Sequence, residues 1–420
     1  MDLLFLGNGF DLHYNLPTTY MCFLKVLECI RVKIEKGEVV NSVAQVLSDP
    51  MLTNIGAIQR CRQEYGADYD YDIDLDQLLL LVKFASSNLW FNYLLSKSLE
   101  NDGWVDFEQE IGKVSEAFSV LFQSIKTGED DLAFLHGEQL YSWRICYNFP
   151  FFFDIKEIES KLRYGGAIPL LDSVLPRYVC QMPSRIDVRC LNSKTIVEDL
   201  FDSLRELANI LSLYLELFVD WPVKRMVDVG KQFYDRFIKE LDWTKTRAVS
   251  LNYTHTLAHS VQPPERDILS IYYIHGELER RQIVLGINAD QKDDIARMDL
   301  TFLPFKKYSQ RVYYNTDNSY LEFIANVRAG RSDLNTLFVI GHSLDATDKD
   351  IISECFNYAQ RIVVFYHKET EVAKYIHNLV AIYGKQGFDN LRLVKRLRFA
   401  PIEDMNLNPI AFKTKYKRQS

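Results

Sequence analysis

The chain has 420 residues, which is enough for two or three domains or for one domain with a large insertion. Hydrophobic residues make up 47% and charged residues 25%, a globular composition that excludes a long disordered chain, a collagen-like repeat and a small disulfide scaffold. Asp and Glu outnumber Lys and Arg by 57 to 49, so the net charge of −8 provides no global basic field for nucleic acid or an anionic membrane.

Cysteine usage and apolar segments bear on where the protein is found. The seven cysteines are scattered, with no Cys-x-x-Cys pair that could begin a zinc site, which favours a reducing cytoplasm. The first apolar run, Leu3–Leu6, meets a glycine at once and does not resemble a secretion signal. Lys83 interrupts the strongest apolar segment, Leu78–Leu95. We therefore expect a cytoplasmic protein without a membrane-spanning helix.

Short apolar runs predict buried parallel strands, several of them ended by Gly or Asn. They are Leu3–Leu6, Ala248–Leu251, Ile271–Ile274, Ile283–Leu285, Leu337–Ile340 and Ile362–Tyr366. After the first, a loop leads to an apolar helix face over 20–30, with Thr18 or Thr19 placed to cap it. The run that ends at Ile340 leads into a glycine turn and then a capping box at 347–350. Two strand, turn and helix units therefore bracket the chain.

Between these units, over residues 31–244, strand signals are scarce and helical periodicity is frequent. The predicted helices include Leu75–Leu95, Trp104–Phe122, Phe201–Phe218 and Val223–Leu241. We expect residues 1–30 and 245–420 to form one α/β domain with a parallel sheet flanked by helices, and residues 31–244 to form a large, mainly helical insertion.

The first candidate site is Gly7-Asn8-Gly9-Phe10-Asp11, directly after the first strand. Two glycines allow a backbone to approach a phosphate, and a helix N-terminus can hold its charge. The third glycine of the G-x-G-x-x-G fingerprint is missing, because Leu12 and His13 follow Asp11. The motif favours nucleotide binding, with a purely structural tight turn as the alternative.

Two further strand ends carry polar side chains. Asn252, in Ser250-Leu251-Asn252-Tyr253-Thr254, lies where ligands of open α/β sheets gather and could bind a ribose hydroxyl or satisfy its own turn. His275, followed by Gly276, could act as a general base near pH 7, although a lone histidine at this position is more often structural. The functional interpretation depends on convergence with the other strand ends.

A fourth motif, Gly341-His342-Ser343-Leu344-Asp345, follows another apolar strand and offers a glycine, a hydroxyl and a carboxylate. These groups suit a contact with ribose or adenine. Gly-His-Ser also suggests a nucleophilic serine, but the G-x-S-x-G elbow requires a glycine where Asp345 stands. The sequence therefore disfavours a serine hydrolase.

Two acidic segments are interpreted as structural. Asp106 and Glu108, two and four residues after Trp104, lie near a predicted helix start, where acidic residues are favoured by the helix dipole. The alternating aspartates over 68–76 do not match the spacing of an EF-hand loop and indicate a solvated acidic segment. With neither a thiolate cluster nor a calcium loop, we expect no bound metal.

Together the motifs resemble the bacteriophage abortive infection family AbiH. The resemblance rests on Gly7–Asp11 followed by Asn15–Tyr20, then Asn252-Tyr253-Thr254, His275-Gly276 and Gly341–Asp345, in this order and spacing. It covers both ends of the chain and matches 31–244 only weakly. That family is similar to the sirtuin-like NAD-binding proteins, which implies a Rossmann-like, sirtuin-like sheet and NAD as substrate or ligand.

The resemblance also implies roles for individual residues. Asp11, Asn252 and His275 would be catalytic, with Asn252 holding the ribose. The remaining positions would bind the nucleotide: Gly7, Asn8, Gly9, Phe10, Gly276, Gly341, His342, Ser343 and Asp345. Only Cys355 lies beyond residue 190, so the four-cysteine zinc module of sirtuin deacylases is absent and protein deacylation is disfavoured.

The first functional hypothesis is an antiphage effector that hydrolyses NAD at the nicotinamide–ribose bond when infection is sensed. A phage-derived trigger and self-association through the helical insertion are the expected partners, and nucleic acid is not. The alternatives are a nucleotide sensor that acts on a partner without turnover, and a metal-dependent nuclease that would use Asp11, Asp106, Glu108 and Asp345.

Overall fold

The computed structural model divides into two compact units by its internal contacts. It describes residues 1–100, 106–127, 145–146, 149, 174–182, 185–230, 235–261, 269–287 and 300–417. The first unit comprises Met1–Val82, Asn209–Val284 and Arg311–Ser420, and the second comprises Lys83–Ala208 and Leu285–Gln310. These boundaries differ from those expected from the sequence, and the helical insertion at 31–244 stays a prediction.

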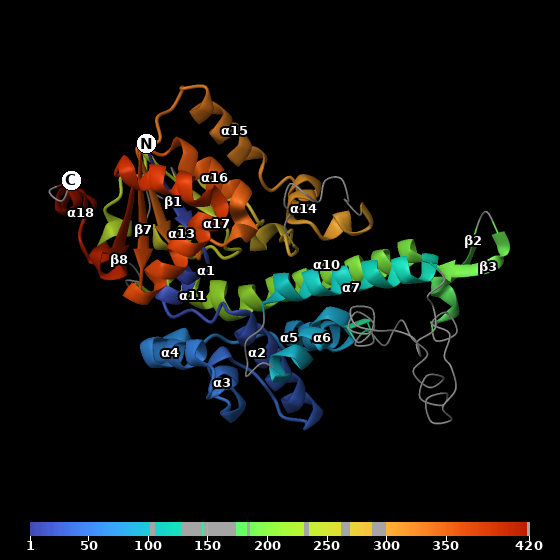
Figure 1. Ribbon diagram of the computed structural model, residues 1–420. Coiled ribbons are helices and arrows are strands. Elements are labelled where there is room, and N and C mark those ends of the chain that lie inside the picture. The colour runs from blue at the N-terminus through green and yellow to red at the C-terminus, as the bar shows by residue number, and fades with distance from the viewer. Residues whose placement is uncertain are drawn as a thin grey trace. The chain divides into compact units, whose positions relative to one another are not determined.

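A six-stranded parallel sheet forms the centre of the first unit (Figure 1). Its strands are β1 (Asp2–Leu6), β4 (Thr246–Ser250), β5 (Ile271–Tyr273), β6 (Thr336–Ile340), β7 (Arg361–Tyr366) and β8 (Leu397–Pro401). They lie in the order β5-β4-β1-β6-β7-β8, and every neighbouring pair is parallel. The predicted α/β class is confirmed. The direction of strand addition reverses between β1 and β6, and ligands of such sheets bind beyond the strand ends at that point.

One strand prediction is wrong, and one strand was missed. Ile283–Leu285 is buried but forms no strand, because its N–H groups bond elsewhere: Val284 N donates to the His275 carbonyl at 2.8 Å and Leu285 N to Gln310 Oε1 at 3.0 Å. Strand β8 was not predicted. Among the described strands it pairs with β7 alone, and Arg398 between Leu397 and Phe399 interrupts its apolar run, as an edge strand allows.

Helices cover both faces of the sheet. Helices α15 (Asn318–Arg328), α16 (Lys349–Tyr358) and α17 (Glu369–Leu393) pack on the face that carries Leu3 and Phe5, and Figure 1 shows α16 and α17 lying over the strands. On the other face, the Phe338 ring lies 5.0 Å from that of Phe237 in α12 (Arg236–Lys239) and 6.0 Å from that of Phe412 in α18 (Pro409–Lys417). Burial on both faces explains why the strands read as continuous apolar runs.

The segment after β1 differs from the predicted loop. A short helix, α1 (Asn8–His13), begins inside the first glycine motif. Thr19 then caps α2 (Tyr20–Glu35), its Oγ1 accepting a hydrogen bond from Cys22 N at 3.2 Å, as predicted. The remaining helices of this unit are α3 (Val43–Leu47), η1 (Pro50–Leu52), α4 (Gly56–Tyr65), η2 (Gly66–Tyr69), η6 (Glu216–Asp220), α11 (Trp221–Asp228), α13 (Thr256–Ser260), η8 (Leu278–Arg280), η11 (Ala346–Asp348) and η12 (Ile402–Asn406).

The second unit is mainly helical. Its elements are α6 (Leu89–Glu100), α7 (Phe107–Thr127), η5 (Pro176–Tyr178), η10 (Leu300–Phe305) and a hairpin of β2 (Val179–Met182) and β3 (Arg185–Leu191). Three further helices begin in one unit and end in the other: α5 (Leu75–Ser87), α10 (Ser193–Leu215) and α14 (Lys307–Tyr314). The Phe149 ring packs 5.3 Å from Trp90 and 5.0 Å from Tyr93. The hairpin was not predicted.

Three predicted helices have different ends. Leu75–Leu95 is two helices, because Asn88 interrupts it and caps α6, its Oδ1 accepting from Phe91 N at 2.9 Å. Phe201–Phe218 lies in α10, which gives way at Glu216 to the π-helical turn η6. Val223–Leu241 is likewise divided between α11 and α12.

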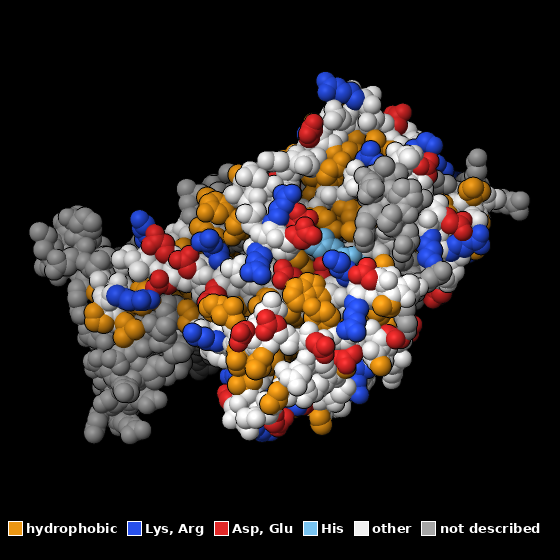
Figure 2. All heavy atoms as spheres, turned by 180° about the vertical axis from the view of Figure 1, so that it is seen from behind, with side chains coloured by type: hydrophobic (Ala, Val, Ile, Leu, Met, Phe, Trp, Pro, Cys, Tyr) orange, Lys and Arg blue, Asp and Glu red, His pale blue; other side chains and the backbone are white. Residues whose placement is uncertain are grey.

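The apolar helices and the surface charges bear on the expected absence of membrane and nucleic-acid partners. Among the residues that the structure describes, no single helix is long and apolar enough to cross a membrane. The helices Leu75–Ser87 and Leu89–Leu99, with a bend of 78° between them, are long and apolar enough only when taken as a pair. On the face in Figure 2, basic and acidic side chains are interspersed over the coloured residues. The exclusion of both partners stays a prediction.

Candidate functional site

The four sequence motifs lie at the carboxyl ends of four adjacent strands in the first unit. Leu6 of β1 is in register with Ser250 of β4 and with Ile340 of β6, and Ser250 is in register with Tyr273 of β5. The polar residues that follow these strands therefore lie beyond the same edge of the sheet, because the strands end in register. We refer to them as the strand-end cluster, defined by Asp11, Asn252, Thr254, His275, His342 and Asp348.

The glycines of the first and fourth motifs bring two backbones into contact. Gly9 N donates to the Gly341 carbonyl at 2.7 Å, and Gly7 N donates to the Ile340 carbonyl at 3.1 Å. A Cβ on Gly9 would lie 2.6 Å from the Gly341 oxygen, and one on Gly341, which has φ +68°, would lie 1.9 Å from Phe10 N. These contacts favour the structural interpretation of the glycines, because both N–H groups already have acceptors within the protein.

Gly341→Ala should destabilise the protein far more than Gly330→Ala. Both glycines have nearly the same positive φ, +68° and +67°, but nothing lies within 4 Å of a Cβ on Gly330. The shared left-handed backbone costs each variant about 1–2 kcal/mol, and the clash with Phe10 N should add about 1–3 kcal/mol for Gly341 alone. Urea unfolding of both variants measures the difference, and equal losses would contradict the close packing of the two loops.

Asp11 is a buried carboxyl of the strand-end cluster. It is 1% exposed, its Oδ2 accepts from Thr254 Oγ1 at 2.7 Å, and its Oδ1 has no hydrogen-bond partner among the described residues. Burial raises the pKa of Asp11 to about 7, and repulsion from Asp220 acts in the same direction. Hydrogen bonds from Thr254, Thr256 and Asn252 oppose this rise. A carboxyl that titrates near neutral pH suits proton transfer or charge stabilisation. Asn252 is also buried, and the structure brings these two predicted catalytic residues together.

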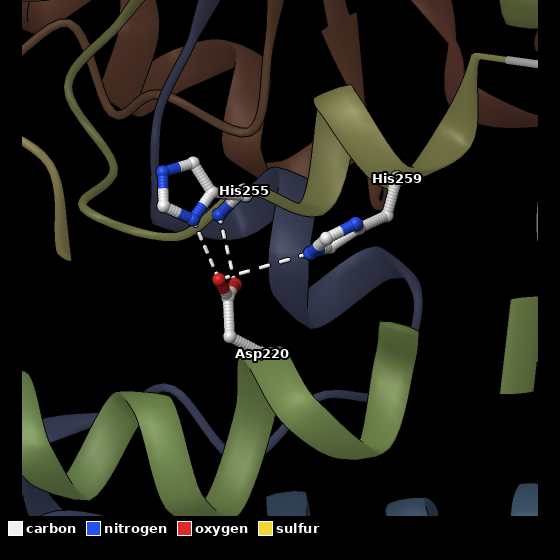
Figure 3. Close-up of side chains that lie close together, drawn as sticks. All are labelled: Asp220, His255 and His259. Atoms are coloured by element: carbon white, nitrogen blue, oxygen red, sulfur yellow. Dashed lines mark hydrogen bonds and ion pairs between the residues drawn. The ribbon is translucent and has the colours of Figure 1, made fainter. Parts of the chain in front are cut away.

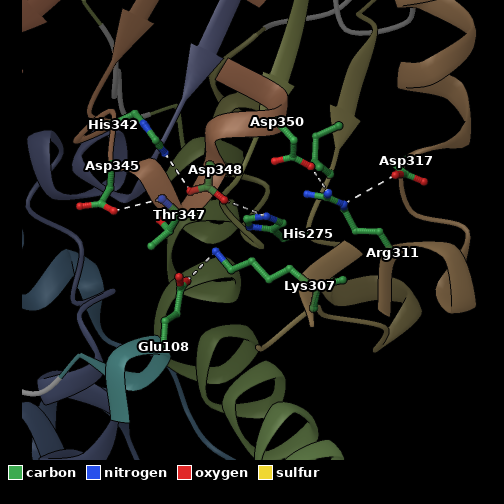
Figure 4. A network of polar contacts seen from close by, with 12 residues as sticks. Glu108, His275, Lys307, Arg311, Asp317, His342, Asp345, Thr347, Asp348 and Asp350 are labelled. Carbon is green, nitrogen blue, oxygen red and sulfur yellow. Dashed lines mark hydrogen bonds and ion pairs between the residues drawn. The ribbon is translucent and has the colours of Figure 1, made fainter. Parts of the chain in front are cut away.

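Asp348 lies between two histidines, one that follows β5 and one that follows β6 (Figure 4). His275 Nε2 is 3.4 Å from Asp348 Oδ1, and His342 Nε2 is 3.3 Å from Asp348 Oδ2. His342 Nδ1 accepts from Leu344 N at 2.9 Å, which places the His342 proton on Nε2, toward the carboxylate. Leu344 has φ +55°, a conformation that branched side chains rarely adopt and that concentrates at functional sites. The sequence had placed Asp348 only in a helix cap.

The other predicted binding residues differ in exposure and in what they contact. Asn8 is exposed, whereas the Phe10 ring is buried and packs on Tyr14 at 5.2 Å. The backbone carbonyl of Ser343 accepts from Asn378 Nδ2 at 2.9 Å. A Cβ on Gly276, which has φ +84°, would lie 1.8 Å from the Gln282 oxygen, so this glycine also permits a close backbone approach.

The predicted capping box at 347–350 needs correction. Asp345 provides the cap instead, its Oδ1 accepting from Thr347 N at 3.1 Å at the start of η11. The N-cap residue of α16 is Asp348, whose side chain makes no capping hydrogen bond. The carboxylate is thus turned toward the two histidines rather than toward the helix.

A second polar group, which sequence reasoning missed, consists of Asp220, His255 and His259 (Figure 3). His255 Nδ1 lies 2.6 Å and His259 Nε2 3.7 Å from Asp220 Oδ2, while His255 N donates to Asp220 Oδ1 at 2.9 Å. Burial opposes the charge on Asp220, but the two histidines outweigh it and hold the pKa of the carboxyl well below its usual range. Burial opposes the charge on His255 too, and Asp220 outweighs it and raises the pKa of the imidazole. The His-x-x-x-His spacing was the available sequence signal.

The acidic residues of the second unit have structural partners. Asp106 Oδ1 accepts from Gln109 N at 3.0 Å and so caps α7, as predicted, and Glu108 pairs with Lys307 at 2.8 Å. Trp104 lies outside the described residues. In the first unit, Asp68, Asp72, Asp74 and Asp76 are exposed, as expected of a solvated acidic segment. Asp70 differs, because it is half-buried and its Oδ1 accepts from Ala44 N at 3.0 Å.

A cavity of about 560 Å³ in the first unit lies among α3, α4 and η2 and is lined by Leu47, Cys61, Arg62 and Tyr69 among others. It contains none of the strand-end residues. Because a single arginine is its charged lining group, it offers little chemistry, and we place the candidate site at the strand ends instead.

Comparisons with known proteins identify the family. No curated protein and no solved structure matches the chain. The model of the family described as "Bacteriophage abortive infection AbiH" matches residues 3–167 and 192–366, a span that includes all four strand-end motifs. The chain therefore belongs to the bacteriophage abortive infection family AbiH.

Proposed function

We propose that this AbiH protein binds NAD beyond the carboxyl ends of β1, β4, β5 and β6 and hydrolyses its nicotinamide–ribose bond during abortive infection. The observation that supports this most is the strand-end cluster, in which Asp11 contacts Thr254 and Asn252. Beyond the same edge of the sheet, Asp348 faces His275 and His342. Numbered among themselves along the chain, the six strands have the order 3-2-1-4-5-6. That order is typical of doubly wound, Rossmann-like folds, which bind dinucleotides at the reversal point.

The reaction needs a base for water and a countercharge for the sugar. The bond between C1′ of the ribose and the nicotinamide nitrogen breaks with its electron pair going to nicotinamide, and a water oxygen bonds to C1′. The products are nicotinamide, ADP-ribose and one proton. Asp348 faces His275 Nε2 at 3.4 Å and favours the tautomer protonated there, so His275 would accept the proton of water at Nδ1.

Asp11 and Asn252 would act on the ribose. Departure of nicotinamide leaves positive charge on the sugar, and a buried carboxylate stabilises such charge strongly because water does not screen it. Asp11, with a pKa of about 7, is readily ionised when a cationic substrate approaches. Asn252, beside it, would hold a ribose hydroxyl and fix the orientation of the sugar.

The second candidate function is a nucleotide sensor without turnover. Two observations favour it: His275 and Asn252 are only 4% and 6% exposed, and the Gly7 and Gly9 N–H groups already bond within the protein. A site of this kind would open to admit a ligand, and that movement could signal to a partner.

Incubation of the purified protein with NAD, followed by chromatography, tests the proposal. We expect nicotinamide and ADP-ribose in equal amounts, and infected cells that carry the protein should lose NAD before lysis. ATP and nucleic acids, incubated in parallel, should remain intact. Binding of NAD without products would favour the sensor, and protected cells with unchanged NAD would refute the hydrolase.

A further inference from the structure

Asp220, His255 and His259 converge from two different elements of the first unit (Figure 3). His255 is the N-cap of α13 and His259 lies four residues later, so one helical turn presents both imidazoles on the same side. Asp220 ends the π-helical turn η6. Turns of this type are rare and often occur at functional sites, because the extra residue changes the direction of the side chains that follow.

We propose that Asp220, His255 and His259 bind a divalent transition-metal ion. Their ligand atoms all lie within 4.8 Å of one another. At metal–ligand distances of about 2.1 Å, the ligand atoms of a tetrahedral site are about 3.4 Å apart. The 3.7 Å between Asp220 Oδ2 and His259 Nε2 is close to this value, and the 2.6 Å between Asp220 Oδ2 and His255 Nδ1 needs to widen by less than about 1 Å. Small side-chain rotations would therefore complete the site.

The surroundings hold these ligands in the required orientation. His255 N donates to Asp220 Oδ1 at 2.9 Å, which leaves Oδ2 toward the imidazoles. With Nδ1 of His255 as the ligand atom, its proton lies on Nε2, which faces Glu277 Oε2 at 3.8 Å. Metal-bound histidines commonly have a carboxylate on the second nitrogen, and such partners strengthen the ligand.

The ligand types identify the class of ion. Two imidazoles and one carboxylate suit zinc, iron, cobalt or manganese, whereas magnesium and calcium prefer oxygen ligands. Three protein ligands leave at least one position open for water or a substrate oxygen. The lack of a thiolate cluster, from which we expected no metal, does not bear on this site because it uses no cysteine.

Solvent can reach the group. The His255 and His259 side chains are 12% and 13% exposed. The alternative is that Asp220 and the histidines only tie η6 to α13 through hydrogen bonds. Metal uptake distinguishes the two, and it does so whether or not the protein cleaves NAD.

Titration of the metal-free, full-length protein with Co²⁺ tests the site, because visible absorption of Co²⁺ reports its ligands. We expect one equivalent to bind, Zn²⁺ to displace it, and calorimetry with Zn²⁺ to give the same stoichiometry. His259→Ala removes a ligand and should weaken binding by more than the 10–100-fold that loss of an outer partner costs. Asp220→Asn keeps the shape of the side chain and should weaken it as well.

His377→Ala is the matched control, because this histidine is exposed on α17. It should bind the metal like the wild type. Circular dichroism of each variant without metal shows whether it is folded, and Asp220→Asn and His259→Ala provide two independent readings. A folded wild type that takes up no Co²⁺ would overturn the proposal, as would undiminished binding in both folded variants.

Discussion

His275→Ala should lower the rate of NAD cleavage by about 10²–10⁴-fold, the usual contribution of a general base. The imidazole would accept the proton of the attacking water, and alanine leaves no group in its place. The loss should fall mainly on kcat, because the proton is transferred in the transition state and not when NAD binds. Nicotinamide release by the purified variant at saturating NAD measures it.

Asp348→Asn should give an intermediate loss. The amide keeps the shape of the side chain but cannot provide the negative charge that faces His275 Nε2 and His342 Nε2. His377→Ala, at an exposed position on α17, should cleave NAD at the wild-type rate. Thermal unfolding of each variant separates lost chemistry from lost fold. Wild-type kcat in a folded His275→Ala variant would contradict the assignment of the base.

The sheet could be predicted from the sequence because its strands are buried on both faces. Leu337–Ile340, for example, is apolar at every position, as expected of a central parallel strand. The edge strand β8 has no such pattern. Ile283–Leu285 has it without being a strand, because apolar content indicates burial and does not reveal which groups accept the backbone hydrogen bonds.

The site was predictable only where a motif adjoins a strand. Asn252 and His275 follow predicted strands, and parallel strands bring their carboxyl ends to one edge. Asp348 lies eight residues beyond Ile340, the last residue of β6, and a local pattern assigns it to a helix cap. Asp220 lies in a helix-rich segment, 35 residues before His255, and their contact exists only in the folded chain.

Wild-type stability should fall as pH rises from about 4 to 7 because of Asp11, and Asp11→Asn should remove this loss. The pKa of this carboxyl is raised from 3.8 to about 7 by burial, so between these values the folded protein keeps a proton that the unfolded chain has released. Each pH unit in that interval then costs about 1.4 kcal/mol, up to about 4 kcal/mol in total. Below pH 4 the contribution is fully present, and above pH 7 it is lost.

Asparagine resembles the protonated acid and has no charge to lose, so the stability of Asp11→Asn relative to wild type should increase between pH 4 and 7 and then level off. Urea unfolding across this range, with a chelator to keep the Asp220 group metal-free, measures it. Asp220, His255 and Tyr273 titrate or carry charge nearby, but they are present in both proteins and cancel to first order in the difference. Asp228→Asn, at an exposed position in α11, is the control and should show no such trend. If the difference in unfolding free energy between Asp11→Asn and wild type does not change with pH, Asp11 ionises as an ordinary carboxyl. Its ionisation could then not change near neutral pH when a cationic substrate binds.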